Sequence, residues 1–439
     1  MSLSLMNIPN NIKILFEGIK QTTYFARSPL SEEEQSLSPT FEKEVSSAEV
    51  VEDIPESFKP IEVTEQEKAI NFYGFVDGVQ RTILLCYSPI PNGCPVPIHI
   101  SHIAVGVILR DGRGQLFLDP ELLASRLLLI GPFELLKRYK KEFEMLSDPN
   151  ILWDNDDRTL GLPEYVNEWV ICDTSYRTTL KERDEQTGTI LSEEDLFNQG
   201  LLRNRARWRA ATLRHRLEFA LLAKCRQKYP EKWLIMDGPL FFPESWGNRD
   251  NRETLILSQI FQVEPGQVED ILLKNVVGII KRHRFRPPSA VLQQIFKLEK
   301  ETQRSAVLRI REEVDRKEQF DDPEVKEPYG GGHLTWYIRL GFLPYGQPQG
   351  FYGLARVDVH RATLELKHID GLDPESFKAI RPQIDRLTIS IIRERLPAVG
   401  LSRGAFQSIP LLYPICQLEK VLKSCLYPKR FLSYLLRGW

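Results

Sequence analysis

The chain has 439 residues, of which 42% are hydrophobic, and a formal net charge of −2, so it can form one large domain or two ordinary ones with a sizeable core. Its six cysteines include no Cys-x-x-Cys pair, which argues against a zinc ribbon and favours free thiols in a reducing compartment. The N-terminal residues lack the basic start and apolar core of a signal peptide, and no apolar stretch approaches the ~18 residues of a membrane span, so we expect a cytoplasmic protein without membrane contact.

Charge is unevenly distributed along the chain. Residues 31–70 contain twelve Asp or Glu and three Lys, a local charge of −9, which leaves about +7 for the remainder. Residues 28–66 are also rich in Ser, Glu and Pro and poor in aromatics, so they bury too little to offset their ordering entropy. We therefore expect an acidic, largely flexible leader over residues 1–69 and a folded domain over residues 70–439.

The folded part begins with residues typical of strands and continues with residues typical of helices. Segments 70–77, 82–88 and 97–110 are rich in Val, Ile, Tyr and Phe and predict three successive strands. Leucines at helical spacing predict a helix over 119–148. The polar, mixed segment 149–200 is interpreted as an insertion.

The longest helix predicted by the sequence covers residues 202–229, where apolar residues follow a helical repeat until Pro230. Later elements alternate between helix and strand: strands at 233–237, 276–281, 333–341 and 350–360, helices at 251–261, 266–273, 288–304 and 374–394, and helix over most of the last forty residues. Consecutive strands followed by alternating helices and strands predict an α/β fold with a mixed sheet flanked by helices.

Two Asp-Gly pairs each follow an apolar run. Asp77 follows Val76, and Asp237 follows Met236. A carboxylate at the end of a buried strand lies at the sheet edge where ligands bind in α/β folds, and the glycine leaves room for a ligand near the backbone. The alternative is that each Asp-Gly pair is simply a favoured turn.

Glu218 is the single acid among nine Lys and Arg in the helix predicted at 202–229, and it lies in the most apolar part of that helix. A buried carboxylate is costly unless it is paired or binds a metal. An ion pair with Arg214 or His215, one turn back, is the alternative explanation. Three acids from separate elements can converge as oxygen ligands for Mg²⁺ or Mn²⁺, and two such cations can bracket a phosphodiester.

Arginines cluster near these acids, with aromatic residues among them. Arg207 and Arg214 lie on the same helix as Glu218, and Arg282 and Arg284 lie in the segment "KRHRFR". Basic clusters bind phosphates without reading sequence, and aromatics stack on unpaired bases, so these arginines are candidates for binding nucleic acid. A solvated charged surface is the alternative.

These motifs resemble those of the NurA nucleases over roughly residues 70–430. "FVDGVQR" resembles the family's first motif, and "LIMDGPL" resembles its Asp-Gly-Pro-Leu motif. Glu218 precedes Asp237 by nineteen residues, as the family's glutamate does, and Lys281 ends "VVGIIK" as a lysine of the family ends a strand. The resemblance implies an RNase H-like fold, a Mn²⁺- or Mg²⁺-dependent nuclease in DNA end processing and repair, a homodimer, and a HerA-like hexameric ATPase as partner.

The sequence departs from the family near its end. In "SIPLLYPICQLEKVL", Gln417 stands where the family has a histidine that completes the metal site. Glutamine can bind a cation through its amide oxygen but cannot carry a proton as an imidazole does. Either three carboxylates suffice, or Glu419, His360 or Asp358 substitutes, or the protein is a non-cleaving relative. For His360 and Asp358, together with Arg356 on one face of a strand, we favour an exposed or structural role.

The resulting hypothesis is a metal-dependent nuclease in which Asp77, Glu218 and Asp237 bind the cation, with Gln417 as a further ligand. Lys281 contacts phosphate or the charge of the transition state. The first alternative is a catalytically degenerate NurA-like protein that binds DNA or acts as a scaffold. The second is a different RNase H-like phosphotransferase of the Holliday-junction or Argonaute type.

Overall fold

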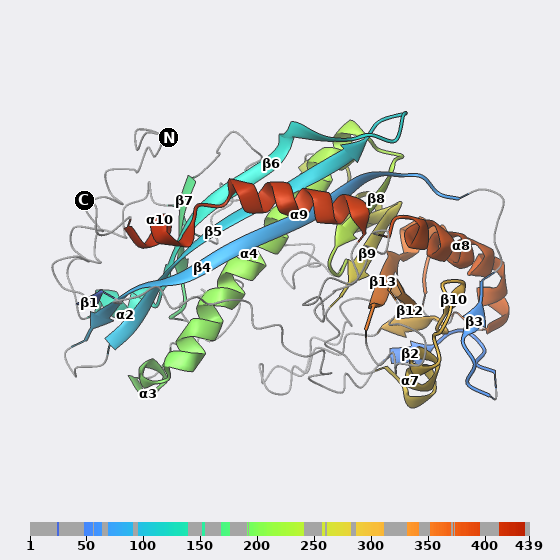
Figure 1. Cartoon of the computed structure of the whole chain (residues 1–439), viewed down its shortest axis with the longest axis horizontal. Coiled ribbons are helices and arrows are strands. Elements are labelled where there is room, and N and C mark those ends of the chain that lie inside the picture. The colour runs from blue at the N-terminus through green and yellow to red at the C-terminus, as the bar shows by residue number, and fades with distance from the viewer. Residues whose placement is uncertain are drawn as a thin grey trace, which may run out of the picture.

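The structure is a computed structural model, and its strands form one 13-stranded mixed sheet. It describes residues 24–25, 48–55, 57–63, 69–90, 95–138, 152–153, 168–175, 191, 193–240, 257–259, 261–281, 287–310, 332–341, 352–369, 372, 374–395 and 412–434. The longest strands, β4 (Phe72–Pro89), β5 (Pro95–Arg110) and β6 (Leu116–Gly131), run side by side (Figure 1).

The remaining elements are shorter, apart from two long helices. The other strands are β1 (Tyr24–Phe25), β2 (Ala48–Val50), β3 (Ile61–Glu62), β7 (Glu168–Asp173), β8 (Trp233–Asp237), β9 (Val276–Ile280), β10 (Gln303–Arg304), β11 (Leu308–Ile310), β12 (His333–Arg339) and β13 (Leu354–His360). The helices are α2 (Phe133–Lys137), α3 (Glu193–Phe197), α4 (Gln199–Lys228), η5 (Pro265–Gln267), α6 (Val268–Leu273), α7 (Ser289–Phe296), η7 (Arg361–Leu364), α8 (Pro374–Arg393), α9 (Tyr413–Cys425) and α10 (Lys429–Tyr434).

The sheet has a parallel centre between antiparallel flanks. Its main path runs β2-β11-β12-β13-β9-β8-β4-β5-β6-β7. Strands β4, β8 and β9 are parallel, whereas β4-β5-β6 and β9-β13-β12-β11-β2 are antiparallel. This mixed sheet with flanking helices confirms the α/β class predicted from the sequence and is compatible with an RNase H-like fold.

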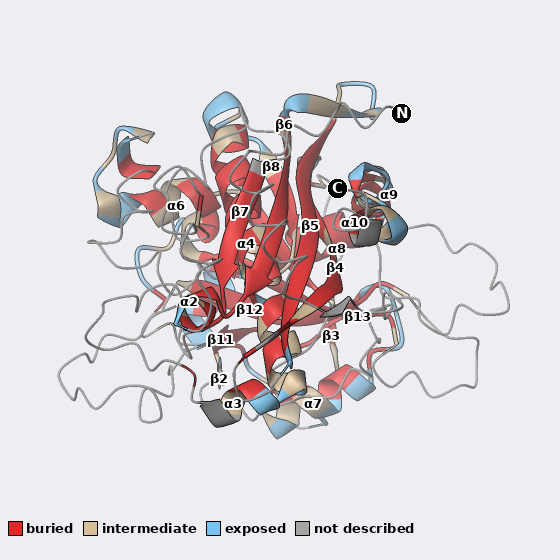
Figure 2. Cartoon of the chain, turned by 90° about the vertical axis from the view of Figure 1, so that its left-hand side faces the viewer, coloured by how far each residue is buried: buried red, intermediate tan, exposed pale blue. Residues whose placement is uncertain are grey.

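Successive residues of β4 face opposite layers of helices. Phe75 belongs to an apolar cluster that includes Leu387 of α8 and Leu418 of α9, whereas Val76 belongs to a cluster with Leu217 of α4. Since strand side chains alternate between faces, α8 and α9 cover one face of the sheet and α4 covers the other. Figure 1 shows α9 running along β4 and β5, and Figure 2 shows that the central strands are buried.

Two predictions for the first half of the domain are wrong. The segments 70–77 and 82–88 form one continuous strand, because Asp77 and Gly78 both pair with β5, opposite Gly106 and Val105. The expected helix over 119–148 is strand β6 as far as Gly131, followed by the short α2. A Leu-rich segment that is buried on both faces has no period-2 alternation, so its sequence pattern also fits a helix.

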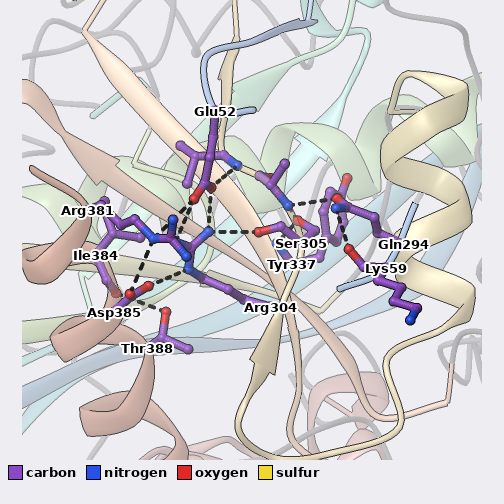
Figure 3. A network of polar contacts seen from close by, with 12 residues as sticks. Glu52, Lys59, Gln294, Arg304, Ser305, Tyr337, Arg381, Ile384, Asp385 and Thr388 are labelled. Carbon is purple, nitrogen blue, oxygen red and sulfur yellow. Dashed lines mark hydrogen bonds and ion pairs between the residues drawn. The ribbon is translucent and has the colours of Figure 1, made fainter. Parts of the chain in front are cut away.

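The prediction of a flexible leader is wrong for residues 48–55 and 57–63, which are part of the domain. Strand β2 pairs with β11, and β3 pairs with β10. Glu52 is 5% exposed and binds Arg304, which is fully buried and also binds Asp385 of α8 (Figure 3). Paired charges make burial of this acidic segment possible.

Other predictions about the chain have partial outcomes. None of the five cysteines among the described residues is in a disulfide; Cys94 lies outside them. Most of the expected insertion at 149–200 lies outside the described residues as well, but β7 within it pairs in parallel with β6. Within the described residues, no helix is both long and apolar enough to cross a bilayer.

Removing one partner from the buried Arg304 network is predicted to destabilise the fold strongly. Arg304→Met leaves the carboxylates of Glu52 and Asp385 without their buried cation, at a cost of about 3–5 kcal/mol in the free energy of unfolding. Arg381 contacts the same two carboxylates but its side chain is 47% exposed, so Arg381→Met should cost about 0–1 kcal/mol. Urea unfolding of both variants measures the difference, and equal losses would contradict it.

Candidate active site at the ends of strands β8 and β9

Asp77 and Asp237 occupy neighbouring positions on two parallel strands. Val76 is in register with Met236, so the next residues along, Asp77 and Asp237, lie side by side. Strand β8 ends at Asp237, and Gly238 turns the chain with φ +142°, whereas β4 continues past Asp77. Phe75, two residues before Asp77, faces the α9 layer, so both carboxylates start from that face of the sheet.

The register of the next strand brings Lys281 to the same place. Asp237 pairs with Ile279 of β9, and Lys281 follows Ile279 by two residues on the same face. The Lys281 Nζ lies 2.6 Å from Asp237 Oδ2. Burial opposes the charge on Lys281, but the carboxylates of Asp237 and Asp77 outweigh it and raise the pKa of its ammonium group. Lys281 is therefore a fixed cation beside Asp237.

Glu218 reaches the sheet from α4, on the opposite face. Its carboxylate occupies space that is open because Gly78 has no side chain. A Cβ atom on Gly78 would lie 2.4 Å from Glu218 Oε1. The same carboxylate contacts Arg214 Nε at 3.3 Å and His215 Nδ1 at 2.9 Å, and Arg214 Nη1 donates to the Gly78 carbonyl at 3.2 Å. The ion pair with Arg214 and the contact with His215 that the sequence suggested are both formed, and the glutamate is also held beside Gly78, the residue that follows Asp77.

The electrostatic balance at Asp77 shows that these groups act on one another. Burial raises the pKa of Asp77 well above its usual value; Asp237 and Glu218 raise it further, while Lys281 and Arg214 lower it. Asp77 is 6% exposed, and its Oδ1 accepts a 2.7 Å hydrogen bond from the Gly78 amide. At the Asp77 carboxylate, the effect of the negative charges of Asp237 and Glu218 exceeds the opposing effect of Lys281 and Arg214.

This surplus of negative charge fits a divalent metal ion. Asp77, Glu218 and Asp237 offer oxygen ligands alone, which suit hard cations such as Mg²⁺ and Mn²⁺. Their oxygens are not gathered within 4.8 Å of one another; among the described residues one group of three side chains meets that limit, and it lies elsewhere. Separation is the expected arrangement for carboxylates that repel one another.

Helix α9 approaches the same region. Cβ atoms on Gly106, the residue paired with Asp77, would lie 3.3 Å from Leu418 and 3.2 Å from Leu422, so these leucines face the sheet. Glu419 acts on Lys281, whose pKa it helps to raise. Gln417 is half-buried and lies about 200° around the helix axis from Glu419. Of the substitutes considered for the family's histidine, Glu419 is therefore the one whose charge reaches the site.

The arginines expected to bind nucleic acid have different surroundings. Arg214 is bound to Glu218, as described above. Arg207 is half-buried on α4 and, with Arg203, adds to the effect of burial that lowers the pKa of His99 to about 3. Arg282 and Arg284 lie outside the described residues. A role in binding nucleic acid remains a prediction for all four.

Two residues of the trio on β13, Arg356 and Asp358, have a structural role. Both are buried, and Arg356 binds the Asp358 carboxylate at 3.1 Å. Thr335 of β12 also donates to Asp358 at 2.7 Å. Asp358 is thus fully engaged within the sheet and does not take the place of the family's histidine. The ion pair of Glu218 with Arg214 was an alternative raised by the sequence, whereas the close approach of Glu218 to Gly78 was not predicted.

No protein-family profile and no curated protein sequence matches this chain. The resemblance to the NurA nucleases therefore rests on the motifs and their spacing.

Gly78→Ala is predicted to displace Glu218. The new methyl would overlap Glu218 Oε1 at 2.4 Å and Arg214 Cγ at 2.9 Å, and overpacking of this kind costs about 1–3 kcal/mol. Gly112 lies in a turn with no atom within 4 Å of its virtual Cβ, so Gly112→Ala is the matched control. Thermal unfolding should show a lower Tm for Gly78→Ala alone; equal Tm values would contradict the close approach.

Asp77→Asn is predicted to stabilise the protein at neutral pH when divalent cations are chelated. The pKa of Asp77 is raised in the fold, so its contribution to stability is full below the ordinary value of about 4 and is lost as pH rises through the folded value. Asparagine keeps the acceptor for the Gly78 amide and has no charge to bury. Tm measured in EDTA from pH 4 upward should fall more steeply for the wild type than for the variant. A variant that is less stable than the wild type at neutral pH would contradict the assignment.

Proposed function

We propose that this protein is a divalent-metal-dependent deoxyribonuclease of the NurA type that hydrolyses phosphodiester bonds during DNA end processing. One observation carries the proposal: Asp77 and Asp237 lie in register on adjacent parallel strands, with Lys281 bound to one of them. Glu218 approaches from the other face against Gly78. A structural salt bridge explains Lys281 and Asp237 but leaves the second buried aspartate beside them unexplained.

Asp77, Glu218 and Asp237 would hold Mn²⁺ or Mg²⁺. When bound, such a cation activates water and stabilises the charge on phosphate oxygens. Other residues of the chain would stabilise charge on the phosphate and orient the metal ligands. Lys281 is held charged beside Asp237, where it can donate to a phosphate oxygen whose charge grows in the transition state. Arg214 keeps the Glu218 carboxylate oriented against the sheet and partly neutralises it before the cation binds.

Partners follow from the same resemblance. The proposed substrate is DNA, and the proposed assembly is a homodimer that works with a HerA-like hexameric ATPase. Arg207, Arg282 and Arg284 would contact the phosphate backbone, a sequence-independent mode of binding that weakens with salt. A cytoplasmic location is consistent with this role.

A non-cleaving DNA-binding or scaffold protein is the second candidate. Gln417 favours it, because the imidazole that completes the site in the family is replaced by a group that cannot transfer a proton. Glu419 binds Lys423 at 2.7 Å, and its charge also helps to raise the pKa of Lys281. This favours the nuclease, since a carboxylate can both bind a cation and accept a proton. Cleavage assays separate the two.

The full-length protein is predicted to cleave end-labelled single- or double-stranded DNA with Mn²⁺ or Mg²⁺ and not with EDTA. Asp77→Asn and Asp237→Asn should each lower the rate by at least about 100-fold, the scale of losing one group that stabilises the transition state. Glu121→Gln, which alters an exposed acid of β6, should leave the rate unchanged. DNA binding without cleavage under every cation, also after addition of a cognate motor, would overturn the nuclease in favour of the scaffold.

A further inference from the structure

Three potential metal ligands meet at the opposite end of the parallel strands. Glu269 lies in the first turn of α6, His333 begins β12, and His360 ends β13. The two histidines are register partners, with ring centroids 5.0 Å apart. One ligand atom from each of the three side chains lies within 4.8 Å of the others.

The spacing is close to that of a coordination shell. His360 Nε2 lies 3.6 Å from Glu269 Oε1. Metal–ligand distances of about 2.0–2.2 Å place two ligands of a tetrahedral zinc site roughly 3.4 Å apart. Small side-chain movements would therefore complete the shell. The histidines are 0–1% exposed and the Glu269 side chain is 39% exposed, which leaves the glutamate side open to solvent.

Polar groups also lie around the other ring nitrogen of His360. Its Nδ1 accepts a 3.3 Å hydrogen bond from the Ala362 amide, and Asp270 Oδ1 lies 3.8 Å away, beyond hydrogen-bonding distance. With a cation on Nε2 the ring proton must lie on Nδ1, so the Ala362 contact would be lost and Asp270 would have to move closer to accept that proton. Arg361 anchors Asp270 at 2.5 Å, and Thr363 donates to the Leu273 carbonyl at 2.9 Å, which ties η7 to the end of α6.

We propose that Glu269, His333 and His360 form a second metal site, one that takes Zn²⁺ rather than Mg²⁺. Imidazole ligands suit Zn²⁺, whereas Mg²⁺ prefers oxygen. The site is separate from the strand-end carboxylates: Val359, next to His360, pairs with Val277, and Lys281 lies four residues, or about 13 Å, further along β9. The bound ion would fasten α6 to the β12-β13 hairpin. The proposed Zn²⁺ site does not depend on the proposed nuclease activity.

Zn²⁺ and Co²⁺ binding to the chelator-treated, full-length protein test the site. We expect Co²⁺ to give the visible absorption of a four-coordinate centre, Zn²⁺ to displace it, and Zn²⁺ to raise Tm. Glu269→Gln changes a half-exposed side chain without altering its shape, so it should fold. It should lower Zn²⁺ affinity by at least about 100-fold, the upper end of what removing an outer-shell partner costs.

Two controls identify which residues hold the ion. His368→Gln, at an exposed histidine outside the cluster, should retain Zn²⁺ affinity, and so should Asp77→Asn at the strand ends. His360→Gln should lose the affinity as Glu269→Gln does, with folding checked by circular dichroism. Folded wild type that fails to bind Zn²⁺, or equal affinity in Glu269→Gln and wild type, would overturn the proposal.

Discussion

The register of three adjacent parallel strands determines what chemistry this fold can hold. Val76 opposite Met236, and Asp237 opposite Ile279, place two aspartates and Lys281 on one face of the sheet, where β8 and β9 end. A shift of one residue in either pairing would turn the carboxylates toward the apolar layer under α4, at a large cost in desolvation. The burial of the hydrophobic residues that precede Asp77 and Asp237 therefore sets the face of the sheet on which these charged residues lie.

Charge balance explains why the site needs both faces of the sheet. Asp77 and Asp237 lie on the α9 face with Lys281, while Glu218 lies on the α4 face with Arg214 and His215. Each carboxylate except Asp77 has a cation at hydrogen-bonding or ion-pair distance. Asp77 has an amide hydrogen bond, and burial, Asp237 and Glu218 raise its pKa, so its ionised form would gain from an added positive charge.

Much of this arrangement could be predicted from the sequence, because the relevant signals are local. The turn at Asp237-Gly238, the helix around Glu218 and the strand before Lys281 follow from apolar periodicity and glycine placement. The continuation of β4 through Asp77-Gly78 could not, because pairing with β5 overrides the turn preference of Asp-Gly. The strand β6 was missed because burial on both faces removes the alternation that distinguishes a strand. The pairing of Glu52 with Arg304 joins residues 252 positions apart, and no local pattern encodes it.

The two ends of β9 offer contrasting ligands, and this contrast bears on metal selection. At the carboxyl end, Asp77, Asp237 and Glu218 would provide a site rich in oxygen, with His215 Nδ1 at 2.9 Å from the Glu218 carboxylate. At the amino end, two buried imidazoles and one glutamate provide a nitrogen-rich site. Imidazole nitrogen suits Zn²⁺, whereas carboxylate oxygen suits Mg²⁺ and Mn²⁺, so a nitrogen-rich site would bind Zn²⁺ and leave the oxygen site to the harder ions. If both sites are occupied, one sheet would separate a structural ion from a catalytic one by donor type.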